Sequence, residues 1–195
     1  MRVVVGATKG GTGKTTTAVA LAVQLARRDG PTVLVDADAG TEGATTWWKG
    51  AESDGWVWPE GLTLVSWQEP MTLPHLGNVV IDTGPGDPGR LSAALALADT
   101  AVVPVRAERA DVAQIGKTVQ LVETAATVHG ITWGVLLTHV VMRSHEATDA
   151  HAAVEEAGFP LLDTRVPFRR DYARMTDTVP EHMGAYRDLL DELEA

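Results

Sequence analysis

Residues 2–17 read RVVVGATKGGTGKTTT, and this stretch decides the fold. A short β-branched run is followed by a loop rich in glycine and then by a helical segment, residues 15–28, which Gly30 and Pro31 end. A strand that leads through a glycine loop directly into a helix lets backbone N–H groups surround an anion, and the helix N-terminus adds a favourable dipole. The stretch therefore predicts a phosphate-binding loop and disfavours a plain flexible turn.

The residue types in the loop indicate their roles. Lys14 is placed to reach the β- and γ-phosphates of a nucleotide, and the Thr15 hydroxyl is placed to bind Mg²⁺. The strict pattern G-x-x-x-x-G-K-[ST] fails at its first position, Thr8, and a second lysine, Lys9, stands at the outer end of the loop. We predict a nucleotide site formed by Gly10, Gly11, Thr12, Gly13, Lys14, Thr15 and Thr16.

Short apolar runs alternate with longer helical segments along the rest of the chain. The predicted strands are residues 2–6, 32–36, 62–67, 78–82, 100–105 and 133–138. The predicted helices are residues 15–28, 90–98, 111–128, 145–157 and 181–195. Apolar runs without polar alternation, separated by helices, are typical of a parallel sheet that is buried on both faces. The predicted fold class is therefore α/β: a single P-loop NTPase domain over residues 1–195, with a mostly parallel twisted sheet and helices on both faces.

Composition excludes several classes of protein. The chain has 195 residues, of which 45% are hydrophobic, enough for one domain with a real core. It has no cysteine, which excludes disulfides, thiolate metal sites, iron–sulfur clusters and cysteine nucleophiles. The first apolar run is too short for a signal peptide and no later run is long enough to span a bilayer, so we expect a cytoplasmic protein. The net charge of −10 confines any nucleic-acid site to a local patch.

Acidic residues follow two of the predicted strands. Asp36 and Asp38 lie on the same side of an extended chain, because side chains alternate with period two. Facing the phosphate loop, Asp36 would lie near the metal and Asp38 would orient or activate the attacking water. The alternative is that both acids cap the next helix. Asp82 follows another buried run and is placed to hold Mg²⁺ through water, whereas Asp87 is predicted to cap the helix that begins near residue 90.

Four segments together resemble the ParA/MinD group of deviant phosphate-loop ATPases: KGGTGKTT, the D-x-D after the second strand, VVIDTGPGD and DTAVVPVRAERADVAQIGKTVQLVE. The resemblance covers nearly the whole chain and is closest to short, ParF-like partition proteins. It implies that Lys9 is the signature lysine and that Lys14 and Thr15 bind phosphate and Mg²⁺. It also implies that Asp38 is the catalytic aspartate and that Asp82 is the second acid on the metal side. The implied cofactors are ATP and Mg²⁺, and the implied catalytic residues are Lys9, Lys14 and Asp38.

Two positions depart from the family pattern. The family usually has Pro-Gln after the D-x-D, where this chain has Ala39 and Gly40. It usually has a Pro-Pro pair where this chain has Gly84 and Pro85. These departures bear on loop geometry and hydrolysis rate more than on nucleotide binding.

Branches of the group differ in features that this chain lacks. Iron proteins of the group need cysteine, and the tyrosine-kinase relatives have a C-terminal tyrosine cluster, whereas this chain has only Tyr172 and Tyr186. MinD-like proteins bind membranes through a basic amphipathic C-terminal helix. Here the final segment has one basic residue, Arg187, against four acids, Asp188, Asp191, Glu192 and Glu194, so we expect no membrane partner. Among these branches, the partition type is the one that the sequence does not exclude.

The resemblance to partition ATPases also implies which partners this protein has. The resemblance implies an ATP-dependent homodimer, association with the nucleoid through non-specific DNA contacts, and a ParB-like or other centromere-binding protein that stimulates hydrolysis. DNA phosphates are bound by arginine and lysine, and the candidate residues are Arg143, Arg169, Arg170 and Arg174, with Arg165 nearby. The alternative, left open, is a solvated surface on which these arginines pair with Asp163, Asp171 and Asp177.

The second lysine of the loop suggests a switch. Lys14 serves the phosphates of its own subunit, so Lys9 is best placed to reach the nucleotide of a partner subunit. Two facing lysines repel each other unless phosphate charge lies between them, which would make dimerisation depend on ATP. Two alternatives remain: an ATPase that positions a protein cargo such as a microcompartment or chemoreceptor cluster, and an ATP-dependent ligase resembling dethiobiotin synthetase, which would not need Lys9.

Five of the six tryptophans lie between residues 47 and 67. Trp67 is predicted to be a core residue of the strand over residues 62–67, while the other four flank a turn rich in glycine, proline and aspartate. One interpretation is a local cap over the sheet edge. The other is that some of these side chains belong to a dimer or partner surface, where tryptophan is enriched.

Overall fold

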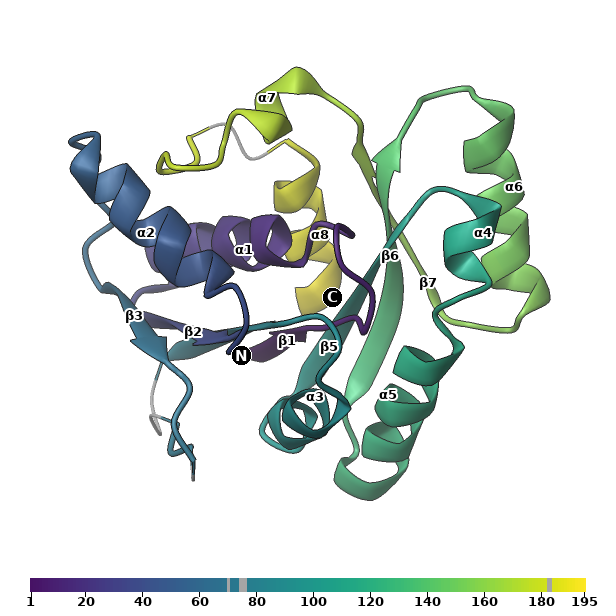
Figure 1. Ribbon diagram of the computed structural model, residues 1–195, viewed down its shortest axis with the longest axis horizontal. Coiled ribbons are helices and arrows are strands. Elements are labelled where there is room, and N and C mark those ends of the chain that lie inside the picture. Colours follow the sequence, from purple (N-terminus) through teal and green to yellow (C-terminus); the bar gives the residue numbers. More distant parts are fainter. Residues whose placement is uncertain (70, 74–76, 182–183) are drawn as a thin grey trace.

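A seven-stranded parallel sheet forms the centre of the molecule (Figure 1). The computed structural model describes the chain apart from residues 70, 74–76 and 182–183. The strand order is β3-β2-β4-β1-β5-β6-β7, and every neighbouring pair is parallel. The strands are β1 Arg2–Val5, β2 Thr32–Ala37, β3 Leu62–Ser66, β4 Asn78–Thr83, β5 Thr100–Arg106, β6 Thr132–Val140 and β7 Leu161–Pro167. The sheet confirms the predicted α/β class.

Helices cover both faces of the sheet, as predicted (Figure 1). One face packs against α1 Lys14–Asp29, α2 Gly43–Ser53 and α8 Ala185–Glu194. The other packs against α3 Pro88–Leu95, α4 Arg109–Val112, α5 Gly116–His129 and α6 His145–Glu156. A short helix, α7 Arg170–Ala173, lies in the connection between β7 and α8. The central helix α1 begins at the phosphate loop, so the loop lies at the middle of the sheet's carboxyl edge.

The central strands are buried on both faces, and their side chains alternate between the two helical layers. Val3 and Val5 pack in the cluster that contains α1, while Val4 packs in the cluster of α3 and α5. Leu34 and Val35 divide in the same way on β2, which lies on the other side of β4. This is the packing that the unbroken apolar runs predict, because a strand covered on both faces has no solvent side for polar residues.

Three elements escaped prediction, namely β7, α2 and the short α7, and one predicted helix is divided. Strand β7 lies at the sheet edge, where the exposed Asp163 and Arg165 alternate with the buried Thr164 and Val166, so it lacks a continuous apolar run. Helix α2 occupies part of the tryptophan segment, which offered no clear helical pattern. The predicted helix over residues 111–128 is two helices, α4 and α5, separated by residues 113–115.

The tryptophan segment mostly follows the local-cap interpretation. Trp47 is buried, and its indole N–H donates to the Thr178 carbonyl at 2.7 Å. Trp48 stacks on Trp58 with ring centroids 4.2 Å apart. Trp67 lies just beyond β3 and is only half-buried, packed against the core, so its prediction as a core residue of the strand is wrong. A partner surface that includes Trp47 is therefore wrong, because its side chain already fills the layer between α2 and the connection before α8.

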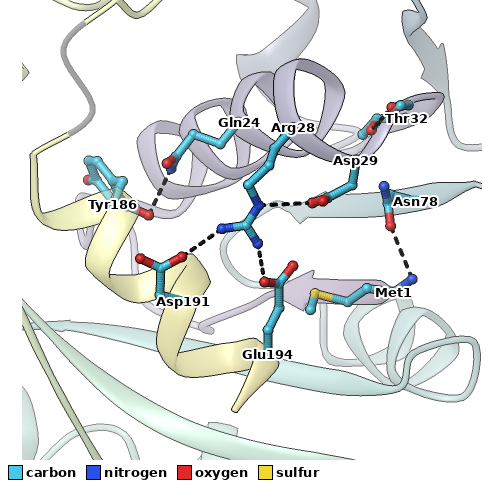
Figure 2. Close-up of polar contacts among 10 residues, drawn as sticks. Met1, Gln24, Arg28, Asp29, Thr32, Asn78, Tyr186, Asp191 and Glu194 are labelled. Carbon is cyan, nitrogen blue, oxygen red and sulfur yellow. Dashed lines mark hydrogen bonds and ion pairs between the residues drawn. The ribbon is translucent and has the colours of Figure 1, made fainter.

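The C-terminal helix is fixed to α1 by polar contacts (Figure 2). Arg28 of α1 pairs with Asp191 at 2.6 Å and also with Glu194, and the Gln24 amide donates to the Tyr186 carbonyl at 2.7 Å. Asp191 and Glu194 are two of the acids from which we expected a C-terminal helix that does not bind membranes. In the described part of the chain, no helix is both long and apolar enough to cross a bilayer.

Candidate nucleotide site

The carboxyl ends of β1, β2 and β4 surround the first turn of α1, where a cavity of about 410 Å³ opens. Six predicted loop residues line it together with Asp38, Thr41 and Pro85; the six are Gly10, Gly11, Gly13, Lys14, Thr15 and Thr16. Ligands in parallel α/β sheets bind at this edge because the loops and helix N-termini converge there. The structure thus brings together the residues that the sequence predicted as a phosphate site.

Glycines shape the loop. Gly11 and Gly13 have φ angles of 72° and 86°, in the left-handed region that favours glycine. Thr12, the remaining predicted residue, is buried, and its carbonyl accepts from the Thr138 hydroxyl at 2.9 Å. Thr138 also faces Gly13, where a Cβ would lie 3.7 Å from its methyl group. The end of β6 therefore supports the loop from behind.

The two lysines of the loop have different environments. Lys14 is buried, and its ammonium donates to the Lys9 carbonyl at 2.8 Å. Burial lowers the pKa of Lys14, although the charges of Asp82 and Asp38 act in the opposite direction. The Lys9 side chain is 33% exposed and pairs with Asp111 of α4, with 2.5 Å between Nζ and Oδ1. Lys14 therefore serves the loop interior, while Lys9 lies at its rim.

The outer limb of the loop is tied to the helices on the opposite face of the sheet. Thr8 donates its backbone N–H to the Thr118 hydroxyl of α5 at 3.0 Å, and the two hydroxyls are 2.9 Å apart. Asp111 is buried and its second carboxylate oxygen has no hydrogen-bond partner among the described residues. The contacts of Thr8 and Lys9 place α4 and α5 directly beside the phosphate loop, which the sequence did not indicate.

Asp36 and Asp38 both hold the loop after β2. Asp36 is buried, and its two oxygens accept the backbone N–H groups of Asp38 at 3.0 Å and Thr45 at 2.8 Å. Asp38 accepts from the Gly40 and Thr41 amides, at 2.9 and 3.1 Å, and from the Thr41 hydroxyl. The capping alternative holds only for Asp36, which accepts the Thr45 N–H in the first turn of α2. Asp38 accepts amides of the loop before α2 and lines the phosphate cavity.

These contacts set the charge of Asp38. Burial favours its neutral form, but the Thr41 hydroxyl, the Thr41 and Gly40 amides and the Lys14 ammonium outweigh burial and hold the pKa of Asp38 below its usual value. Asp38 is therefore ionised at neutral pH. An ionised carboxylate beside a phosphate cavity can accept a proton or orient a water molecule.

Asp82 lies on the strand next to Asp36 in an opposite environment. The register pairs Asp36 with Asp82, and neither Asp82 oxygen has a hydrogen-bond partner among the described residues. Burial raises the pKa of Asp82 to about 7, with Thr15 and Lys14 acting against this shift and the charges of Asp36 and Asp38 adding to it. A buried carboxyl without partners fits a cation or its bound water nearby. Asp87, by contrast, caps α3 by accepting the Arg90 N–H at 2.9 Å, as predicted.

A second cavity, of about 120 Å³, adjoins the phosphate loop. It shares Gly13 and Thr16 with the first cavity. Its other walls come from the ends of β6 and β7 and from the connection to α8, and include Thr138, His139, Phe168, Arg169, Tyr172 and Tyr186. His139 and Phe168 stack with centroids 6.0 Å apart. Burial, aided by the Arg106 charge, lowers the pKa of His139, so the ring is neutral.

Apart from Gly13, Thr16 and Arg169, the residues of this second cavity were not predicted as site residues. His139 directly follows the predicted strand 133–138, so the rule that ligands bind after parallel strands could have identified it. Phe168 follows β7, which the sequence pattern did not reveal, so no signal in the sequence pointed to it.

The predicted arginines do not form one cluster of equivalent side chains. Arg143 follows β6 with a φ of 63°, and Arg170 and Arg174 lie in or after α7; all three are exposed. Arg169 lines the second cavity. Arg165 points to α6, where its guanidinium lies 3.1 Å from His151 Nδ1. The segments after β6 and β7 are neighbours, because Phe168 N–H donates to the Val140 carbonyl at 2.8 Å.

Comparisons with known proteins identify the chain as a nucleotide-binding domain. A family model described as CbiA, the CobQ/CobB/MinD/ParA nucleotide binding domain, matches residues 3–178. Maintenance of carboxysome distribution protein A from Gloeobacter kilaueensis is 35% identical over 163 residues, which cover 80% of this chain and 71% of that protein. Protein ParA from Rhizobium radiobacter is 30% identical over 185 residues, covering 89% and 81%. The septum site-determining protein MinD from Pyrococcus horikoshii, complexed with Mg-ADP, has the same fold, with a TM-score of 0.77, 18% identity and coverage of 99% and 95%.

Proposed function

The chain belongs to the CobQ/CobB/MinD/ParA family of nucleotide-binding domains, and from this membership we propose that it is a ParA-type positioning ATPase. In this proposal Mg-ATP binding drives formation of a homodimer with the nucleotides at its interface. The dimer binds DNA without sequence preference, and a partner protein stimulates hydrolysis and releases it. The name of the Gloeobacter kilaueensis relative gives one class of cargo, the carboxysome, and a plasmid or chromosome is the other class that we propose.

The site has the groups that ATP and Mg²⁺ would need. The backbone of residues 10–16 would surround the phosphates, and Lys14 would offset their charge. The Thr15 hydroxyl would bind Mg²⁺, with Asp82 and Asp36 behind it. The unpartnered oxygens of Asp82 support this assignment, because a buried carboxyl would gain most from a nearby cation. Mg²⁺ supplies neutralisation of charge on the phosphate oxygens.

The second cavity would hold the nucleotide base. It adjoins the phosphate cavity through Gly13 and Thr16, and His139 and Phe168, whose rings stack on each other, both line it. A neutral imidazole and a phenyl ring suit stacking against a purine. Asp38, ionised and at the phosphate cavity, would orient the attacking water.

The observation that carries the proposal is the separation of the two lysines. Lys14 is buried in its own loop, whereas Lys9 is partly exposed at the rim and is held by the single carboxylate of Asp111. A triphosphate is a stronger anion than one carboxylate, so the nucleotide of a second subunit can draw Lys9 away from Asp111. Without that nucleotide the facing lysines repel, which makes the dimer depend on ATP.

The DNA surface is proposed at the ends of β6 and β7. Arg143, Arg170 and Arg174 are exposed and form no salt bridge within the described part of the chain. They lie at the edge of the sheet that carries the proposed nucleotide site. Because the net charge of the protein is −10, this basic region is a local exception to an acidic chain. Arg165 is left out of the proposed surface, because its guanidinium is occupied by His151.

Analytical ultracentrifugation with ATP, ADP or no nucleotide tests the switch. Wild type is expected to dimerise only with ATP. Lys9→Ala should bind nucleotide yet stay monomeric and fail to hydrolyse, while Lys14→Ala should lose about 2 kcal/mol or more of nucleotide binding with its charged contact to phosphate. Lys49→Ala, an exposed lysine on α2, is the matched control. A Lys9→Ala protein that dimerises and hydrolyses normally would overturn the cross-interface role.

DNA co-sedimentation at low salt extends the same experiment. ATP-bound wild type should be retained by DNA, and the double substitution Arg143→Ala and Arg170→Ala should reduce retention without affecting dimerisation. Arg187→Ala on α8 is the control, because it is equally exposed but lies outside the proposed surface. Absence of ATP-dependent retention would remove nucleoid binding from the proposal, and an ATP-bound monomer would favour the ligase alternative.

A further inference from the structure

The residue after β4 makes an unusually close approach to Asp38. Gly84 is buried, and a Cβ placed on it would lie 2.4 Å from Asp38 Oδ1, 2.7 Å from Asp38 Cγ and 3.1 Å from Asp38 Cα. The first two distances are shorter than any ordinary van der Waals contact. The φ angle of Gly84 lies outside the left-handed region, so the constraint is space and not backbone conformation.

Asp38 has little freedom to move away. Its oxygens are held by the amides of Gly40 and Thr41 and by the Thr41 hydroxyl. The carboxylate therefore lies between its own turn on one side and the bare Cα of Gly84 on the other.

The segment that contains Gly84 cannot easily retreat either. Gly86 donates its N–H to the Thr8 carbonyl at 3.0 Å, which ties this segment to the phosphate loop. Pro85 lines the phosphate cavity and lies 3.9 Å from the position that a Cβ on Gly10 would take. A side chain at position 84 would therefore displace Asp38 or disturb the loop.

We propose that Gly84 is a positioning residue for Asp38: its missing side chain leaves the space in which the carboxylate is held at the phosphate cavity. This inference rests on the proposed role of Asp38 in ATP hydrolysis. Gly84 itself touches no reacting atom and acts only through Asp38. Misplacement of an orienting group by about 1 Å lowers turnover by as much as about 100-fold, so turnover should be sensitive to a methyl group at this position.

The test compares Gly84→Ala with Gly89→Ala. Gly89 lies in α3, where a Cβ would make only an ordinary contact, 3.5 Å from Asp87 Oδ1, so the same substitution is tolerated there. Gly84→Ala is expected to lower kcat for ATP at least about 10-fold while the nucleotide Kd stays within about 2-fold. An equal loss of nucleotide binding would show that Gly84 serves the phosphate loop instead, and unchanged kcat would overturn the proposal.

A double-mutant cycle separates positioning from general destabilisation. In the wild-type background Gly84→Ala is expected to lower the unfolding midpoint by about 5 °C, because the added methyl overpacks the site. In an Asp38→Ala background the carboxylate is gone, so the same substitution should cost less than half of that shift. Equal shifts in the two backgrounds would mean that Gly84 does not act through Asp38.

The outcomes also separate this inference from the proposed function. If wild type hydrolyses no ATP but the unfolding cycle shows coupling, the proposed function fails while the contact between Gly84 and Asp38 stands as a structural constraint, and the positioning role in hydrolysis falls with it. If wild type hydrolyses ATP and Gly84→Ala does so equally well, the proposed function stands and only the positioning role is wrong.

Discussion

Asp38 and Asp82 end neighbouring strands at the same edge of the sheet, yet their surroundings are opposite. The loop after β2 surrounds Asp38 with two amides and a hydroxyl. The end of β4 leaves both oxygens of Asp82 without a partner among the described residues. The pKa of Asp38 is held below its usual value, whereas burial raises that of Asp82 to about 7.

The difference shows how one residue type can take two roles within one site. A loop can offer N–H groups because its backbone is not committed to a sheet, so it stabilises an anion. The N–H groups of β4 are in the ladder and no loop amide of the described residues reaches Asp82, so this acid is desolvated without compensation. We therefore expect Asp38 to act as an anion toward water and Asp82 to need a cation.

The substitution Asp38→Ala should have the largest effect on the contrast between Asp38 and Asp82. Hydrolysis of ATP should fall by about 100-fold or more, because an orienting or proton-accepting group is lost. Nucleotide affinity should change little, since the phosphates are bound by the loop. Steady-state turnover and equilibrium binding measure the two quantities. Asp87→Ala, which removes only the α3 cap, is the control; normal turnover of Asp38→Ala would place the catalytic role elsewhere.

Asp82→Asn tests the other member of the pair through stability. Because the folded pKa is raised to about 7, the folded carboxyl keeps its proton between about pH 4 and 7 while the unfolded chain has lost it, so this group's contribution to stability falls as pH rises through that window. Without nucleotide, Asp82→Asn should be more stable than wild type at pH 8, by on the order of 1–4 kcal/mol, and equal to it near pH 4.

Chemical unfolding of nucleotide-free protein at both pH values gives this difference. Asp36→Asn is a useful comparison, because Asp36 accepts two backbone amides and its substitution should destabilise at neutral pH. If Asp82→Asn is instead less stable than wild type at pH 8, then other groups stabilise the ionised Asp82 carboxylate in the folded protein. The contrast with Asp38 would then be wrong.

Thr41→Val is the mildest test. It removes the hydroxyl that donates to Asp38 but keeps the backbone amides, so we expect a loss of about 1 kcal/mol in unfolding free energy and a partial return of the Asp38 pKa toward its usual value. Thr46→Val, an exposed threonine on α2, is the matched control. Urea unfolding of both variants measures the difference, and equal losses would remove the hydroxyl from the account of Asp38.

Prediction from sequence succeeded where the signal is local. The β1 strand, the glycines and Lys14 lie within one short stretch, and Asp87 was recognised as a cap only three residues from the N–H that it accepts. Prediction failed for β7, because an edge strand with one exposed face resembles an ordinary polar segment. It also left Asp36 and Asp38 between capping and catalysis, and the structure separates them: Asp36 accepts an amide of α2, whereas Asp38 holds its own loop and lines the phosphate cavity.

The sequence by itself determined the phosphate loop, the parallel sheet and the acids beside it, since each depends on residue types a few positions apart. Only the tertiary structure decided the environment of each group. Lys9 meets Asp111 across 102 positions of sequence, and Thr8 meets Thr118 across 110. Gly84 gives Asp38 its space from a different strand. Such contacts depend on how layers pack against the sheet, and no pattern along one segment contains that information.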